Sequence, residues 1–189
     1  MHINFTKLIY SSILATALCI SNFGIGAENT ATSSQVIKKI EGVYKERFEN
    51  ALVSGEKYQS EDIIEIVPYS ADSIYFRISL QFYNGHSCGI YGIAKYSENT
   101  FIYRSGDEQT EQRICTLKIS ADEKALRITD RLTQTSASTC SAYCGARGSL
   151  GKYDVSLDKK RKIRYMPIIL KSRQYTEAVD EHKKQANSK

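Results

Sequence analysis

One segment of the chain has an alternation of side chains that fits only one kind of regular element. Within residues 72–83, DSIYFRISLQFY, every second position from 74 onward is large and apolar, and the positions between them are polar or amphipathic. A β-strand directs successive side chains to opposite faces, whereas a helix would distribute these residues around its axis. The segment therefore predicts a half-buried strand with an inward face of Ile74, Phe76, Ile78, Leu80 and Phe82. Its outward, polar face is expected to carry Tyr75, Arg77 and Tyr83.

The two residues after this strand predict a hairpin. Asn84 and Gly85 both tolerate the positive φ angles of a type I′ turn, and residues 87–95 have the composition of a returning strand that can bulge or bend at Gly89 and Gly92. Similar runs rich in Ile, Val, Tyr and Phe give seven expected strands before residue 131. Because no helical periodicity interrupts them, we predict a mainly β fold, an antiparallel meander closing into a small barrel of about eight strands.

The C-terminal part of the chain has a different pattern. Residues 156–170 are expected to hold one more strand, which ends near Pro167. Beyond it, apolar and amphipathic side chains recur at the spacing of one helix face. Ser172 can serve as the N-cap of this helix, and lysines stand in its last turn. They predict a C-terminal amphipathic helix whose packed face is Tyr175, Ala178, Val179 and His182.

The first 27 residues have the three-part layout of a secretory signal peptide. Lys7 supplies the positive charge, residues 8–20 form an uncharged and mostly apolar run, and the small residues of GIGA offer a cleavage point near Ala27. The run is shorter than the roughly 20 residues that a helix needs to cross a bilayer. We therefore expect an exported protein, periplasmic or secreted, that does not span the membrane. One alternative is an uncleaved membrane anchor. The other is a lipoprotein attached through Cys19, but the bulky Leu18 before it disfavours lipid attachment.

Length and charge indicate the remaining organisation. Residues 28–38 are expected to be a flexible lead-in, residues 39–170 one disulfide-bonded barrel domain, and residues 171–189 a helix with a frayed tail. The formal net charge of +5 is mild, so it favours solubility and acidic partners. An exported chain without base-stacking motifs is not expected to bind nucleic acid.

Four cysteines remain once Cys19 is removed with the signal peptide. An even number in an oxidising compartment predicts two disulfides, whereas zinc would need paired short spacings and a redox site would need C-x-x-C. The meander brings Cys88, Cys115, Cys140 and Cys144 to one end of the barrel, here called the cysteine pole. Because a bond between Cys140 and Cys144 would constrain almost nothing, we expect each to bond to a strand cysteine, with the pairing undecided.

Residues 40–48, IEGVYKERF, resemble the G-x-W opening of lipocalin and calycin barrels, with Gly42 at the glycine and Tyr44 at the tryptophan. The wider pattern, from EGVYKERFEN through FYNGHSCGIYGIA and CTLKI to YCGARGSL, resembles a poorly characterised group of exported bacterial proteins with small disulfide-bonded barrels. In size and style the chain also resembles periplasmic lysozyme inhibitors and toxin-neutralising immunity proteins, without their signature residues. The resemblance implies a lipocalin-like barrel in which Arg147 either packs back on the ring of Tyr44 or points outward to a partner.

Catalytic motifs are not recognisable, and we expect neither an enzyme nor a cofactor or metal. Residues 145–151, GARGSLG, lack the lysine and the preceding parallel strand of a phosphate-binding loop. Ser149 does not lie in a G-x-S-x-G turn. Paired carboxylates can hydrolyse glycosides, but Asp107 and Glu108 belong to a polar loop, where such groups are usually solvated.

The cysteine pole holds the candidate partner-binding residues: His86, Asp107, Glu108, Tyr143 and Arg147. Tyrosine offers a large, rigid contact area with a polar tip, and loops linked by disulfides are preorganised for binding. The leading hypothesis is an inhibitor or immunity-type protein that occludes a protein partner with the 84–87 turn, the 105–112 loop and the 140–149 corner. The alternative is a lipocalin-like carrier that binds a small apolar ligand inside the barrel.

A basic run, KKRKIR, is the strongest electrostatic feature of the chain: Lys159, Lys160, Arg161, Lys162 and Arg164. The favoured interpretation is a solvated turn whose charges protect a neighbouring strand from edge-to-edge pairing. The alternative is contact with anionic lipid head groups, a glycan or an acidic protein partner.

Overall fold

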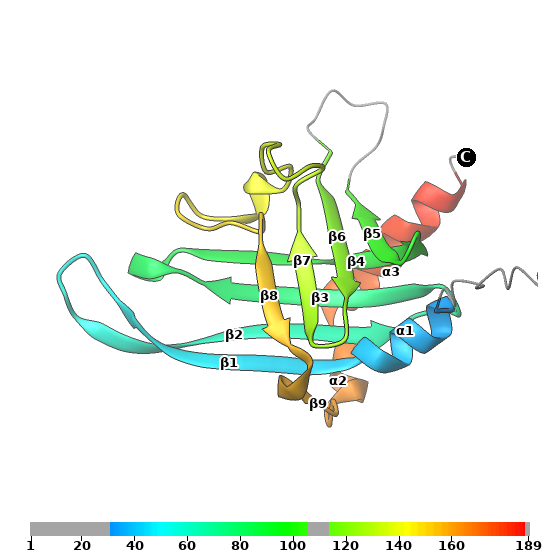
Figure 1. The fold of residues 1–189 in the computed structure, drawn as a ribbon, viewed down its shortest axis with the longest axis horizontal. Helices are drawn as coiled ribbons and strands as arrows, with labels where there is room; N and C mark the ends of the chain where they lie inside the picture. The colour runs from blue at the N-terminus through cyan, green and yellow to red at the C-terminus, as the bar shows by residue number, and fades with distance from the viewer. Residues whose placement is uncertain (1–30, 106–113, 188–189) are drawn as a thin grey trace, which may run out of the picture.

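The computed structural model describes residues 31–105 and 114–187 and confirms the predicted antiparallel meander (Figure 1). Nine strands form one sheet in the order β8-β7-β6-β5-β4-β3-β2-β1-β9, which curls into a nearly closed barrel. The strands are β1 (Gly42–Ala51), β2 (Lys57–Pro68), β3 (Ser73–Gln81), β4 (Ser87–Ser97), β5 (Thr100–Arg104), β6 (Thr116–Ala121), β7 (Ala125–Thr129), β8 (Tyr153–Ser156) and β9 (Lys160–Arg161). The α-helices are α1 (Ser33–Ile40), α2 (Met166–Leu170) and α3 (Arg173–Asn187). The proposed signal peptide lies outside the described residues.

The chain itself joins the two edges of the sheet. β8 stands at one edge and β9 at the other, and only the single 3₁₀ turn Leu157–Lys159 separates them in sequence. β9 pairs with the start of β1, where Val43 lies opposite Arg161. This short connection holds the barrel nearly closed.

The first seven strands occupy the predicted places, and the hairpin after β3 has the predicted backbone. Asn84 and Gly85 have positive φ angles of 60° and 72°. The loop is nevertheless one residue longer than a two-residue turn, because the Phe82 N–H donates to the carbonyl of His86 at 2.7 Å. The extra residue places Tyr83 at the outer end of the hairpin.

The inward face of β3 is the centre of the main core, as its alternation predicts. Ile74, Phe76, Ile78 and Leu80 are at most 1% exposed, and Phe82 packs half-buried at the end of the row. Inward residues of the other strands complete this core, including Tyr44, Ile64, Ile90, Phe101, Leu117 and Leu126.

The outward face of the sheet is also covered in part, which corrects the expectation for Tyr75. This residue was assigned to a polar face, yet it is fully buried, with its ring 5.0 Å from the ring of Tyr175 in α3. A second hydrophobic cluster forms here from Val43, Val67, Tyr75, Ile93, Ile163, Ile169 and Ala178. Tyrosine is found both on solvent-exposed and on buried faces of a sheet. The alternation alone therefore could not show that helices cover the outward face here.

The C-terminal helix α3 is confirmed together with its packed face. The Ser172 hydroxyl accepts from the Tyr175 N–H at 3.2 Å, as an N-cap does. Ala178 is buried, and the ring of His182 meets the edge of Tyr69 with 5.5 Å between centroids. Burial, and then the nearby charge of Lys95, lower the pKa of His182.

One buried ionic network ties the sheet to the chain before α2. Glu65 on β2 is 1% exposed and lies directly opposite Arg77 on β3. Its carboxylate accepts from Arg77 Nε at 2.5 Å and from the Tyr165 hydroxyl at 2.5 Å. Because both donors come from different elements, they fix the carboxylate between the sheet and the segment that leads into α2.

Two segments differ from what their sequence predicts. The lead-in at 28–38 was expected to be flexible, but its last residues form α1, because Thr32 and Gln35 make a reciprocal capping box and Ile37 and Ile40 are buried. The strand expected in residues 156–170 is present only as the two-residue β9, and a 3₁₀ turn and α2 occupy most of the segment. Pro167 favours this result, because a proline in the first turn of a helix loses no hydrogen bond.

The two glycines of β4 differ in a way that predicts opposite responses to alanine. A Cβ at Gly92 would lie 2.4 Å from Cε2 of the buried Tyr103, whereas a Cβ at Gly89 would meet nothing within 4 Å. We expect Gly92→Ala to lower the free energy of unfolding by roughly 1–3 kcal/mol through overpacking. Gly89→Ala, the matched control, should leave stability unchanged or slightly raised. Urea denaturation followed by circular dichroism measures both, and equal stabilities would contradict the assigned packing of Tyr103.

Candidate functional site

Two disulfides join the strands to the 140–149 corner, as the cysteine count predicts. Cys88 at the start of β4 bonds to Cys144, and Cys115 before β6 bonds to Cys140. The bonds close separations of 56 and 25 residues, so each constrains a substantial loop. The corner is thereby attached both to β4 and to the segment that leads into β6.

Backbone contacts bring the corner against the start of β4. The Gly145 N–H donates to the carbonyl of Ser87 at 2.8 Å, next to the disulfide of Cys88. A Cβ at Gly148 would lie 2.7 Å from the Cys88 sulfur, so this position needs glycine for the chain to pass over the disulfide. The glycines of this segment therefore serve close packing.

A buried aspartate that sequence reasoning missed anchors the other end of the corner. Asp130 is 0% exposed, and its carboxylate accepts from the Cys140 N–H at 3.0 Å and from the Ser138 hydroxyl. The Thr139 hydroxyl donates to the Asp130 carbonyl at 2.8 Å and accepts from the Thr116 N–H at 3.0 Å. The only signal in the sequence was a carboxylate directly after the apolar run of β7, ten residues before Cys140.

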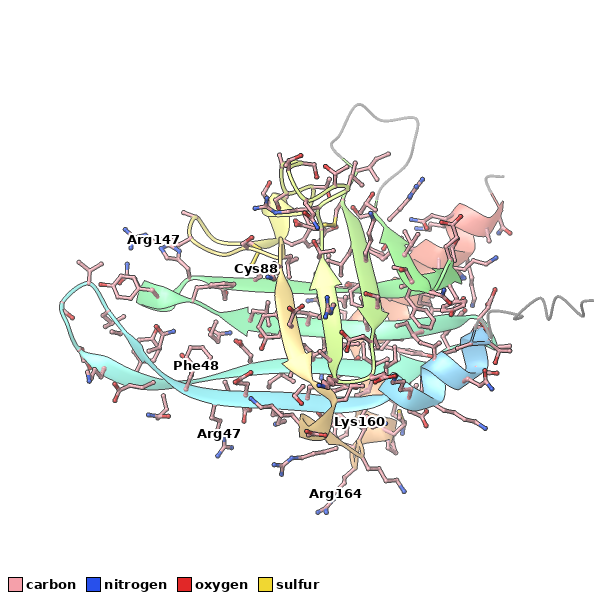
Figure 2. All side chains as sticks on the ribbon, viewed as in Figure 1. Arg47, Phe48, Cys88, Arg147, Lys160 and Arg164 are labelled. Carbon is pink, nitrogen blue, oxygen red and sulfur yellow. A yellow bond between two sulfur atoms is a disulfide. The ribbon has the colours of Figure 1, made fainter. Side chains whose placement is uncertain are left out.

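The corner meets two turns of the sheet at one end of the molecule. We define the disulfide-linked tip as residues 52–54, 82–87 and 144–148; Figure 2 labels Arg147 within it and Cys88 directly after its second segment. The Tyr83 hydroxyl donates to the Leu52 carbonyl at 3.2 Å, and the Val53 N–H donates to Asn84 Oδ1 at 3.1 Å. These bonds hold the turn between β1 and β2 against the turn between β3 and β4.

Two exposed side chains of this tip, Tyr83 and Arg147, are of kinds that are enriched among binding hot spots. The Arg147 guanidinium lies 5.6 Å from the ring centroid of Tyr83, a cation–π distance. Tyr83 is 44% exposed and Val53 is 67% exposed, although both are large apolar residues. Tyr and Arg are the residues most enriched among binding hot spots. The tip is thus a rigid platform with an apolar edge and one oriented cation.

The structure brings some of the predicted site residues together and separates others. His86 and Arg147 both lie at the tip, where half-buried His86 packs against Gly145. Tyr143 instead turns inward, packs on the main core and interacts with the hydroxyl of buried Tyr103. Asp107 and Glu108 lie outside the described residues.

Arg147 packs back on the protein, but on a different ring from the one that the lipocalin resemblance implied. Its partner is Tyr83 at the tip. Tyr44, the residue at the tryptophan position of the motif, is 1% exposed and donates its hydroxyl to the Ile40 carbonyl at 2.9 Å. Because Tyr44 is enclosed by α1 and the barrel, its ring is not available to Arg147.

The basic run lies far from the tip, at the β9 end of the molecule (Figure 2). Lys159 pairs with Glu46 at 2.6 Å, and Lys160 Nζ donates to the carbonyls of Lys38 and Lys39. The other three cations of the run, Arg161, Lys162 and Arg164, are exposed. The run therefore consists of two structural lysines and three solvent-facing cations.

A buried carboxylate, Asp62, links two strands that are far apart in the sheet order. Asp62 on β2 accepts from the Gln81 N–H at 2.7 Å and from the Tyr153 hydroxyl of β8 at 2.9 Å. Burial raises the pKa of Asp62 in spite of these hydrogen bonds. The group thus bridges β2 and β8 across the barrel.

Three further comparisons concern metal sites, membrane spans and known proteins. Residues 31–105 and 114–187 contain no group of three or more His, Cys, Asp or Glu side chains that could hold a metal ion. No helix within these ranges is long and apolar enough to cross a membrane. Comparison with known proteins yields no matching family model, curated protein or solved structure.

Proposed function

We propose that this chain is an exported binding protein of the inhibitor or immunity type, which occludes a protein partner with its disulfide-linked tip. The observation that carries the proposal is the exposed Tyr83–Arg147 pair, which is held in place by a disulfide and by hydrogen bonds from two turns. A preorganised surface loses little conformational entropy on binding, so its contacts contribute more fully to affinity. Two disulfides fit an oxidising compartment and therefore export.

The barrel interior favours this role over that of a small-ligand carrier. Large side chains from β3, β5 and β6 meet inside the barrel, among them Phe76, Phe101 and Leu117, each 0% exposed. The hydrogen bond between Asp62 and Tyr153 also joins β2 to β8. An apolar ligand would have to displace these packed and hydrogen-bonded groups, whereas a protein partner would contact only the tip.

Affinity capture from periplasmic and secreted extracts tests the proposal directly. The wild-type chain is compared with Arg147→Ala and with Arg173→Ala, the control, which removes an exposed arginine from α3. Because truncation of a central hot-spot residue costs more than about 1.4 kcal/mol, we expect Arg147→Ala to raise the Kd for the captured protein about tenfold or more. Arg173→Ala should leave the Kd unchanged.

Two outcomes would overturn the proposal. Either the wild type captures no protein reproducibly, or both arginine variants retain the captured protein with wild-type affinity. Circular dichroism of both variants confirms that any loss of binding is not loss of folding.

A further inference from the structure

A surface at the β9 end of the molecule combines exposed cations with exposed apolar side chains, and the proposed function does not use it. Ile168 is 70% exposed and Leu170 is 44% exposed, the most exposed pair of large apolar side chains close together in the described chain. Single exposed apolar residues are ordinary, but two of them beside a proline and several cations require an explanation.

The geometry of α2 explains why these side chains face outward. Each residue rotates a helix by about 100°, so a buried Ile169 places Ile168 and Leu170 on its two flanks. Pro167 and Lys171 then lie on the side opposite Ile169, and both are exposed. The exposed side of this short helix therefore carries Pro167 and Lys171, with the apolar side chains of Ile168 and Leu170 on its two flanks.

Several exposed cations lie next to this helix in the sequence. Arg161, Lys162 and Arg164 precede the helix, are exposed, and make no ion pair within residues 31–105 and 114–187. Lys160, at the start of the same segment, lies beside the end of α1, because its Nζ donates to the carbonyls of Lys38 and Lys39. No acidic residue occurs between residues 159 and 171. We define the basic–apolar patch as Arg161, Lys162, Arg164, Pro167, Ile168, Leu170 and Lys171.

We propose that the basic–apolar patch docks the protein on an anionic lipid bilayer. Peripheral membrane contacts need shallow apolar insertion together with cations at the depth of the head groups, and the patch supplies both on one short segment. An acidic glycan or peptide would use the cations but would leave Ile168 and Leu170 exposed to water. The cations of the patch together with the exposed apolar side chains of α2 favour a lipid surface.

The location of the patch is compatible with partner binding at the same time. In Figure 1 β9 and α2 lie at the lower end of the molecule, whereas the turns of the tip project to the left. A protein resting on a bilayer through α2 would keep Tyr83 and Arg147 accessible. The proposed docking surface therefore does not depend on the proposed partner site.

Vesicle co-sedimentation of the protein as purified, with its N-terminus established by mass, tests this inference. The probes are vesicles of phosphatidylcholine alone and vesicles in which phosphatidylglycerol replaces part of it. Each cation at an anionic surface raises the partition coefficient roughly fivefold, so Arg161→Gln/Lys162→Gln/Arg164→Gln should lower binding about a hundredfold. Ile168→Ser/Leu170→Ser should lower it about tenfold or more through lost insertion. Added salt should weaken wild-type binding.

The matched control is Lys124→Gln/Lys152→Gln/Lys184→Gln, which removes three exposed cations elsewhere and should retain most of the binding. Equal loss in the control and the patch variant would overturn the proposal, because binding would then follow net charge alone. Wild-type binding that does not depend on Ile168 and Leu170 would also overturn it, in favour of a polyanion contact. Absence of wild-type binding to the anionic vesicles would do the same, whatever the result of partner capture.

Discussion

Replacement of Arg77 by methionine is expected to lower the free energy of unfolding by about 3–5 kcal/mol, because it leaves a buried carboxylate without its cation. Glu65 is 1% exposed and the Arg77 side chain is 32% exposed, so a methionine at 77 would leave the carboxylate mostly shielded from water and without a cation. The Tyr165 hydroxyl would remain as a neutral donor at 2.5 Å, which does not balance a full charge. Methionine keeps much of the apolar stem of arginine, so the loss should report the charge and not a cavity.

The chain offers a closely matched control in Arg47→Met. Arg47 and Glu61 are also directly opposed on neighbouring strands, and Arg47 Nε lies 2.8 Å from Glu61 Oε1. The Arg47 side chain is 80% exposed and points away from the barrel (Figure 2), so we expect a loss of at most about 1 kcal/mol. The two pairs share residue types and strand geometry, but they differ in burial and in a second cation, Lys45, whose Nζ lies 3.3 Å from Glu61 Oε2.

Urea denaturation measures both variants, and a third variant isolates the cause. Glu65→Gln/Arg77→Met removes both charges, and we expect it to recover part of the stability lost in Arg77→Met. An Arg77→Met loss no larger than that of Arg47→Met would show that Glu65 does not need its cation. A double variant no more stable than Arg77→Met alone would show that packing, not charge, was lost.

The strands could be predicted because their periodicity is local. The alternation in residues 72–83 requires a strand whatever surrounds it, and Asn84-Gly85 requires a turn, so the meander follows from short stretches of sequence. The second core is different, because it depends on which segment returns to cover the sheet. The alternation places Tyr75 on the outward face of the sheet, and only the position of α3 shows that this face is covered there.

The cysteine pole could be located from the topology, but its details depend on side-chain geometry. A meander places Cys88, Cys115 and the corner at one end, whereas the choice of partner for Cys140 or Cys144 depends on how the corner turns. The same limit applies to the candidate site: a list of residues near one pole could not tell that Tyr143 points inward and that Arg147 meets Tyr83. Nor could the sequence show that Lys159 and Lys160 of the basic run are bonded to β1 and α1 while the other cations face solvent.

Removal of the Cys88–Cys144 disulfide by a double alanine variant is expected to lower the free energy of unfolding by about 4 kcal/mol, from the entropy that a loop of this length gains in the unfolded chain. The Cys115–Cys140 loop is shorter, which alone gives about 3.5 kcal/mol. Both of its cysteines are buried, at 2% and 0% exposure, so the cavity left behind adds to that loss. Urea denaturation compares each variant with the wild-type chain.

The two disulfides should differ more clearly in what they do to the tip than in what they contribute to stability. Only the Cys88–Cys144 bond joins the segment of Arg147 to the strand that follows Tyr83 and His86, whereas Cys115–Cys140 fixes the corner at its other end, beside Asp130. Under conditions where both variants remain folded, trypsin should therefore cut after Arg147 much faster in Cys88→Ala/Cys144→Ala than in Cys115→Ala/Cys140→Ala. Cleavage after Lys124, in the exposed turn before β7, is the internal reference and should change little. Equal cleavage after Arg147 in the two variants would mean that the hydrogen bond from Gly145 to Ser87 holds the tip without the disulfide, and that the preorganisation of the Tyr83–Arg147 surface has its origin in the backbone.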